Sequence, residues 1–196
     1  MALNLSIKYQ EKYSRAQLLV RTIPGLFYIY LPHLTLLLLT KVLCFANIVA
    51  CFLSILVFQK IPNKIFNFNL EMHAWQARVL ASMMHLYEGY PQFPFTKKNK
   101  KMTVEVLQKE KYSRFHLLIK LTFGLLYLTI PHGVILLIRI SITVILTILA
   151  WFSVLIQGKY PKSWFEFNLG TLRWSMRYNL YQTGFIEMFP KFGATP

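Results

Sequence analysis

One motif occurs twice in this chain, each time directly after a long apolar run, and this limits the folds that the chain can adopt. One copy occupies residues 159–174 and the other residues 60–75, so corresponding positions are 99 residues apart. The same offset relates Tyr13 to Tyr112 and Pro91 to Pro190, with no gap between them. Self-similarity at a fixed period is the mark of repeated structural units, so we expect a tandem duplication of one supersecondary module.

The composition favours a membrane environment. Hydrophobic residues make up 55% of the 196 residues, more than is usual in a soluble domain. Lys and Arg outnumber Asp and Glu by 22 to 7, which gives a net charge of +15. The bases flank the apolar runs, and no nucleic-acid-binding module is recognisable, so we expect anionic lipid rather than nucleic acid as the partner of these charges.

We therefore predict an all-α integral membrane protein with two tandem repeats, at residues 1–95 and 110–196, joined by a basic linker at 96–109. Each repeat is expected to form a transmembrane helical hairpin followed by an amphipathic interfacial helix. Ser14 and Ser113 are candidate caps of the first helices, and Asn69 and Asn168 of the interfacial ones. The expected helices are 14–31, 34–58 and 69–88 in the first repeat, and 113–130, 133–157 and 168–184 in the second.

A proline-histidine pair interrupts each apolar run and allows either a kink or a tight turn. A straight helix from Tyr13 to Phe58 would be roughly 70 Å long, over twice the hydrocarbon thickness, which favours the turn. Four crossings then return both termini and the linker to one side. The positive-inside rule makes that side cytoplasmic.

The repeated motif places bases and aromatic rings at the expected membrane boundary, where rings span the headgroup layer and cations meet phosphates. These residues either bind anionic lipid or only set the depth of the helices. They are Lys159, Tyr160, Lys162, Trp164, Arg173, Trp174 and Arg177 in the second repeat, and Lys60, Trp75 and Arg78 in the first.

Four further bases lie inside the apolar segments, where an unpaired charge is costly. Arg21 and Lys120 occupy matching positions and are expected to extend back to the interface that their helix enters. Lys41 and Arg139 have three options: to extend to the other interface, to bind anionic lipid, or to pair with an acid of another subunit.

His33 and His132 are also related by the repeat, and two such imidazoles could ligate a haem or a metal. The alternative is that each Pro-His pair only caps the turn. No acid lies nearby to orient an imidazole as a ligand, so we expect no cofactor other than bound lipid.

The sequence contains no Asp, no glycine-rich phosphate loop and no catalytic metal motif. We therefore expect a non-enzymatic accessory or scaffold subunit that packs against a larger membrane protein complex. The alternative from another class is a small membrane transporter or channel, which would need polar residues facing each other at the midplane.

The order of Tyr-Ser-Arg, Pro-His, Gly-Lys-Tyr-Pro, Trp-Phe-Glu-Phe-Asn-Leu-Gly and Leu-Arg-Trp in the second half resembles a bacterial membrane family of unknown function, domain of unknown function 4389. The resemblance covers nearly the whole second module. It implies a multi-pass protein of a bacterial inner membrane, without any activity or catalytic residue. The first half departs from this pattern, because Ile61, Ile65, Glu71 and Ala74 replace Tyr160, Trp164, Gly170 and Arg173.

Overall fold

The computed structural model describes residues 3–96 and 101–193, and these residues are mostly helical. The first half contains β1 (Leu3–Ile7), α1 (Arg15–Thr22), the π-helical turn η1 (Leu26–Tyr30), α2 (Leu31–Leu39), α3 (Lys41–Phe58) and α4 (Asn63–Met83). The second half contains β2 (Met102–Val106), α5 (Arg114–Gly124), the π-helical turn η2 (Leu125–Thr129), α6 (Ile130–Gln157) and α7 (Lys162–Gln182). The bounds of β1 and β2, and those of α4 and α7, differ by 99 positions at both ends.

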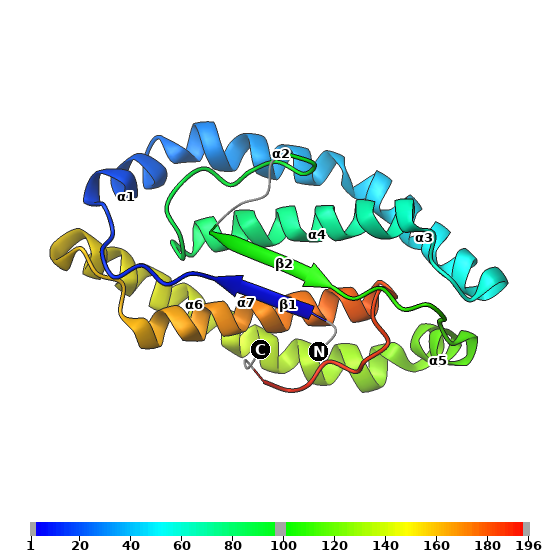
Figure 1. Cartoon of the computed structure of the whole chain (residues 1–196). Coiled ribbons are helices and arrows are strands. Elements are labelled where there is room, and N and C mark those ends of the chain that lie inside the picture. Colours follow the sequence, from blue (N-terminus) through cyan, green and yellow to red (C-terminus); the bar gives the residue numbers. More distant parts are fainter. Residues whose placement is uncertain (1–2, 97–100, 194–196) are drawn as a thin grey trace.

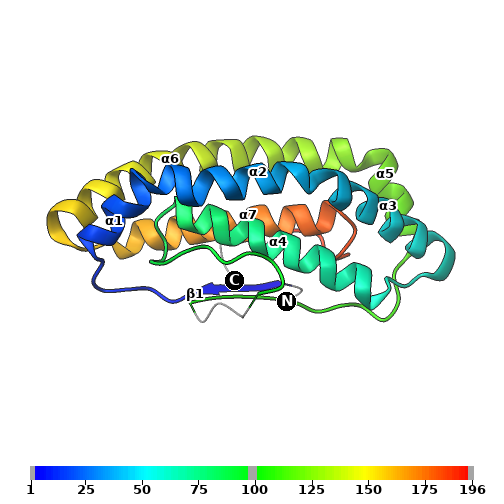
Figure 2. The ribbon, with the colours of Figure 1, turned by 90° about the horizontal axis from the view of Figure 1, so that it is seen from above.

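The elements form three levels (Figures 1 and 2). Helices α1, α2 and α3 follow one long edge of the molecule, and α5 and α6 follow the other. Helices α4 and α7 contact each other and lie between these edges on one side of them. The β1–β2 ribbon covers the opposite side of α4 and α7, as the second view shows. The buried core lies mainly around α4 and α7.

Neither proline-histidine pair forms the predicted turn. Helix α6 continues through Pro131, and Arg114–Gln157 is one continuous helical segment of 44 residues. Each proline directly follows a π-helical turn, in which the N–H of the preceding residue bonds to the carbonyl five residues earlier. This local widening of the helix goes with a proline, which has no N–H of its own to donate. The first edge is instead bent by 59° between α1 and the segment Leu26–Leu39.

The structure therefore differs from the predicted four crossings. Among the described residues, two helices are long and apolar enough to cross a membrane, Lys41–Phe58 and Arg114–Gln157. A third candidate arises if the bent pair Arg15–Thr22 and Leu26–Leu39 is counted as one span. These helices suggest a membrane protein, but they are not arranged as two hairpins.

The predicted starts of the first helices, and the predicted ends of the second, agree with the structure. The side chain of Ser14 accepts a hydrogen bond from the N–H of Gln17, and that of Ser113 accepts one from His116. The apolar runs end at Gln59 and Gly158, both in the left-handed conformation that commonly closes a helix.

The predicted starts of the following helices are wrong by six residues. Helices α4 and α7 begin directly after Pro62 and Pro161, whose fixed φ suits the start of a helix. Asn69 and Asn168 are therefore interior residues and not N-caps, and both are buried. The two helices are also not peripheral, because the ribbon on one side and the long helices on the other cover them.

The all-α prediction missed the antiparallel ribbon, in which Leu5 pairs with Val104 at the centre. Leu3, Leu5 and Ile7 are buried against the helices, while Asn4 and Ser6 are exposed on the outer face. Strand β2 lies inside the predicted linker, of which residues 97–100 lie outside the described part of the chain.

The two halves join reciprocally at both ends of the molecule. Arg15 donates a hydrogen bond to the carbonyl of Ile156, and Arg114 donates one to the carbonyl of Val57. Each guanidinium thus meets the C-terminal end of the other half's long helix, where the helix dipole favours a positive charge.

Candidate functional site

The candidate site is the inner surface where the two long edges face α4 and α7. Arg21 of α1 is buried there and donates hydrogen bonds to the carbonyls of Tyr87 (2.7 Å) and Ser82 (2.8 Å). Lys120 of α5 is buried too, and its ammonium donates to the carbonyl of Tyr181 at 2.6 Å. These two bases therefore turn into the protein and do not extend to the interface as predicted.

A matching pair of histidine-tryptophan contacts lies further along the same surface. The indole N–H of Trp75 donates to Nδ1 of His33 at 2.8 Å, and that of Trp174 donates to Nδ1 of His132 at 3.0 Å. Both imidazoles are completely buried. They stack on rings of the segments that follow α4 and α7, with centroids 4.2 Å apart for His33 and Phe93.

These contacts fix which nitrogen carries the proton. An indole N–H can only donate, so Nδ1 of each histidine accepts and the proton of the neutral ring is on Nε2. Nε2 is buried without a hydrogen-bond partner in both His33 and His132. Haem ligation through Nε2 would require its lone pair, so this arrangement does not suit the haem alternative. Among the described residues, no group of three or more His, Cys, Asp or Glu side chains could hold a metal ion.

Arg139 of α6 is fixed against α7. Its Nε donates to Oγ1 of Thr171 at 3.2 Å, and its NH2 donates to the carbonyl of Phe167 at 3.1 Å. Its guanidinium also lies 4.1 Å from the centroid of the Phe167 ring. These contacts are with a neighbouring helix of the same chain, an arrangement not predicted from the sequence, and they leave Arg139 half-buried.

The first half differs at the corresponding place. Position 40, the counterpart of Arg139, is a threonine, and a cavity of about 150 Å³ opens there between the α2–α3 junction and α4. Lys41, which is exposed, lines this cavity together with the buried Asn69, the half-buried His73 and the exposed Gln76 of α4. Lys41 is therefore available to a ligand from outside, whereas Arg139 is occupied.

The residues predicted to form one lipid-binding belt are divided among different surroundings. Tyr160 is fully buried and accepts a hydrogen bond from Nδ2 of Asn168 at 2.8 Å; burial raises the pKa of this phenol to about 12. Arg173 donates to the carbonyl of Leu5 in the ribbon, and Arg177 donates to the carbonyl of Gly193.

The other residues of the predicted lipid-binding belt differ in how exposed they are. Lys60, Lys159 and Lys162 are exposed and lie at the ends of the molecule, where the long helices pass into α4 and α7, while Trp164 is half-buried. Arg78 lies 3.8 Å from Glu71 and donates to the carbonyl of Gln92.

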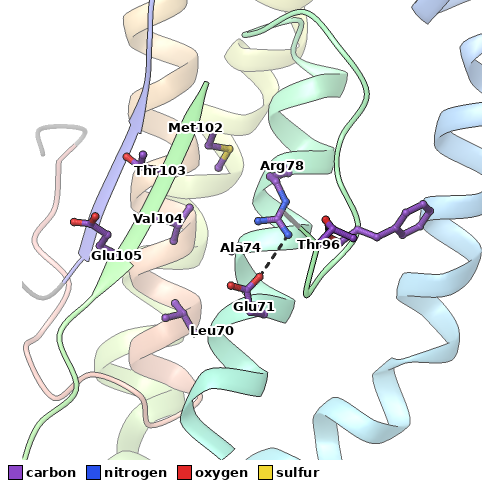
Figure 3. A pocket seen from close by; sticks show the side chains of 10 residues that line it. Leu70, Glu71, Ala74, Arg78, Thr96, Met102, Thr103, Val104 and Glu105 are labelled. Atoms are coloured by element: carbon purple, nitrogen blue, oxygen red, sulfur yellow. Dashed lines mark hydrogen bonds and ion pairs between the residues drawn. The ribbon is translucent and has the colours of Figure 1, made fainter. Parts of the chain in front are cut away.

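Sequence reasoning missed a second cavity, of about 120 Å³, between α4 and β2 (Figure 3). The ion pair of Arg78 and Glu71 lies at its wall, and Met102, Val104 and Glu105 of β2 line the other side. The alternation of apolar and polar residues in 3–7 and 102–106 is the signal that could have revealed this ribbon.

Comparison with known proteins gives one match. Residues 121–194 match the model of a family described as domain of unknown function (DUF4389). No curated protein and no solved structure matches the chain. The match supports the resemblance seen in the second half, which contains α6 and α7 with Arg139, His132 and Trp174.

Proposed function

We propose that this protein is a non-enzymatic scaffold subunit embedded in a bacterial inner membrane, with its termini on the cytoplasmic side. The observation that carries the proposal is the opposite polarity of the two sides of the long helices. Their outward side is apolar along its length, with exposed residues from Leu19 to Phe58 and from Phe115 to Ile156. Arg21, Lys120, Arg139 and the imidazoles of both proline-histidine pairs bind α4, α7 or the segments after them instead. Such a surface suits hydrocarbon and leaves the ribbon side for a protein partner.

We further propose that the scaffold consists of two tandem copies of one module. The support comes from hydrogen bonds that recur at the same offset, such as Tyr13 to the carbonyl of Leu86 and Tyr112 to that of Phe185. The two copies differ at some corresponding positions, such as Thr40 in the first and Arg139 in the second. A cavity lies beside Thr40, so the copies are not equivalent as binding surfaces.

Lipid binding is assigned to the exposed bases at the two ends, because Arg173 and Arg177 already bind backbone carbonyls. Lys60 and Lys64 lie at one end, and Lys159 and Lys162 at the other, all exposed. Each base near an anionic surface contributes about 1 kcal/mol, and salt screens this attraction.

The lipid assignment is tested with liposome flotation. Binding of the purified protein to vesicles with and without phosphatidylglycerol is compared for wild type and for the double variant Lys159→Gln with Lys162→Gln. The matched control is Lys8→Gln with Lys191→Gln, which removes the same charge elsewhere. We expect the first variant to lose part of the preference for anionic vesicles and the control to keep it. Equal losses in both variants would contradict an assignment to the ends.

The scaffold role is tested by gentle extraction of the protein from its native membrane and identification of what co-purifies. We expect a stable complex with at least one other membrane protein. Recovery only as a monomer or homodimer, together with ion conduction after reconstitution into liposomes, would instead establish the transporter or channel alternative.

A further inference from the structure

The length of the long helices limits how this molecule can sit in a bilayer. The segment Arg114–Gln157 has 44 residues, which corresponds to about 66 Å at 1.5 Å per residue. The hydrocarbon core of a bilayer is only about 30 Å thick. Large apolar side chains are exposed along the whole segment, from Phe115 near its start to Ile156 near its end. A helix that crossed upright would leave about half of this apolar surface in water.

The position of the ribbon gives a second constraint. Arg173, in the middle of α7, binds the carbonyl of Leu5, so the ribbon lies beside the middle of the long axis (Figure 1). The ribbon has two strands, and its outward side chains include Asn4 and Ser6. If the long axis followed the membrane normal, these open strand edges and side chains would lie at mid-depth in the bilayer. Open sheet edges facing lipid do not occur within hydrocarbon.

The polar side chains on the outward side of the long helices are compatible with hydrocarbon. The hydroxyl of Thr122 donates to the carbonyl of Leu118, and that of Ser141 donates to the carbonyl of Leu137. The amide of Asn47 likewise donates to the carbonyl of Leu43. Each of these groups finds its acceptor one turn earlier in its own helix, so its donor N–H or O–H needs no water.

We propose that the protein lies flat in one leaflet, with α1–α3 and α5–α6 parallel to the membrane plane and the ribbon in water. This proposal rests on the membrane location proposed above and replaces the predicted crossings with a monotopic arrangement. A helix with its side chains is about 10–12 Å across, which fits the roughly 15 Å of hydrocarbon in one leaflet. Helices α4 and α7 then lie at headgroup level, and the bases at both ends contact the same membrane surface.

Polarised infrared spectroscopy tests the orientation directly. Helices α3, α4, α6 and α7 all run roughly along one axis, so their amide dichroism adds rather than cancels (Figures 1 and 2). In oriented bilayers of phosphatidylethanolamine and phosphatidylglycerol, we expect an amide I dichroic ratio below the isotropic value. A ratio above the isotropic value means that the helices follow the membrane normal, and it overturns the proposal.

Single cysteines distinguish the possible topologies. In a background with Cys44→Ala and Cys51→Ala, the variants Lys60→Cys and Lys159→Cys report on opposite ends of the long axis, and Val134→Cys reports on the outward side of α6. The probe is a membrane-impermeant maleimide, applied to right-side-out and inverted vesicles. We expect both end variants to react from the same side and Val134→Cys to react from neither.

Other labelling patterns exclude the flat arrangement. Reaction of the two end variants from opposite sides indicates an upright molecule. Reaction of Val134→Cys from the side opposite to the ends indicates the hairpins that the proline-histidine pairs suggested. If the protein does not lie in a membrane at all, Val134→Cys reacts freely and the protein does not float with liposomes. This result differs from every labelling pattern of a membrane-embedded molecule.

Discussion

The indole N–H of Trp75 donates a 2.8 Å hydrogen bond to Nδ1 of the completely buried His33. Trp75→Phe removes the donor and leaves a buried acceptor unpaired, which costs about 1–3 kcal/mol. We expect the melting temperature in detergent to fall by roughly 2–4 °C per kcal/mol. A double-mutant cycle with His33→Leu is the control, because the double variant should lose less stability than the sum of the two single losses. Additive losses would show that the hydrogen bond contributes nothing of its own.

Arg139 and Lys41 should behave differently although they occupy adjacent places in the two halves. Arg139→Met leaves Oγ1 of Thr171 and the carbonyl of Phe167 without their bonds to the guanidinium, so we expect a loss of about 1–3 kcal/mol. Lys41→Met changes an exposed side chain, so we expect a change within about 0.5 kcal/mol. Thermal unfolding of both variants in the same detergent measures the two changes in stability. Equal losses of stability would contradict the different roles given to Arg139 and Lys41.

Glu187 should stabilise the fold in a pH-dependent way. Burial raises the pKa of its carboxyl, but hydrogen bonds from Lys109 and from the N–H of Ser113 outweigh this and hold the pKa below its usual range. A pKa that is lower in the folded state stabilises the fold above the unfolded pKa, and this contribution is lost as the pH falls through the folded value.

Glu187→Gln should therefore lower stability at pH 7 by about 1 kcal/mol, the usual contribution of a helix cap, and much less near pH 3. Melting curves at both pH values measure the difference, with the exposed Glu166→Gln as the control. A difference that is equal at both pH values would mean that the charge of the carboxylate is not responsible.

His85 should make the protein sensitive to mild acid. Burial, and secondarily the nearby guanidinium of Arg21, lowers the pKa of this imidazole to about 4. Between the ordinary pKa near 6.5 and this value, the unfolded chain binds a proton that the folded chain does not. Stability should therefore fall as the pH drops through this window, by about 1.4 kcal/mol per unit.

His85→Asn tests this prediction, because asparagine tolerates the positive φ of 55° at this position and does not titrate. Burial also lowers the pKa of His73 to about 4, so the variant should flatten the pH dependence of the melting temperature only in part. An unchanged slope between pH 7 and pH 4.5 would contradict the role of His85.

Much of the local structure could be predicted from the sequence. Ser14 and Ser113 are helix caps as expected, and the long helices end at Gln59 and Gly158, because capping chemistry and the left-handed stop depend only on neighbouring residues. The bounds of α4 and α7 differ by 99 positions, the same offset that relates the two copies of the sequence motif.

The prediction failed where a residue had two locally acceptable states. A proline can form a turn, or it can stand in a helix that continues after a π-helical turn. At Pro131 the helix continues, and α6 packs along α7. The alternation within 3–7 and 102–106 indicates strands, but the ribbon pairs residues about a hundred positions apart. The pairing partner of each strand therefore could not be predicted from its own five residues.

Local propensity and composition were therefore enough to predict which segments are mainly helical, which are apolar enough for hydrocarbon, and where the bases stand along them. The direction in which those bases point depends on the packing of helices that are distant in sequence. Arg21 binds carbonyl groups at the end of α4 and just after it, and Lys120 binds a carbonyl group at the end of α7. Arg139 binds a carbonyl group and a threonine hydroxyl within α7. Each does so because a cation taken out of water needs acceptors. The outward side of the long helices is left apolar as a result.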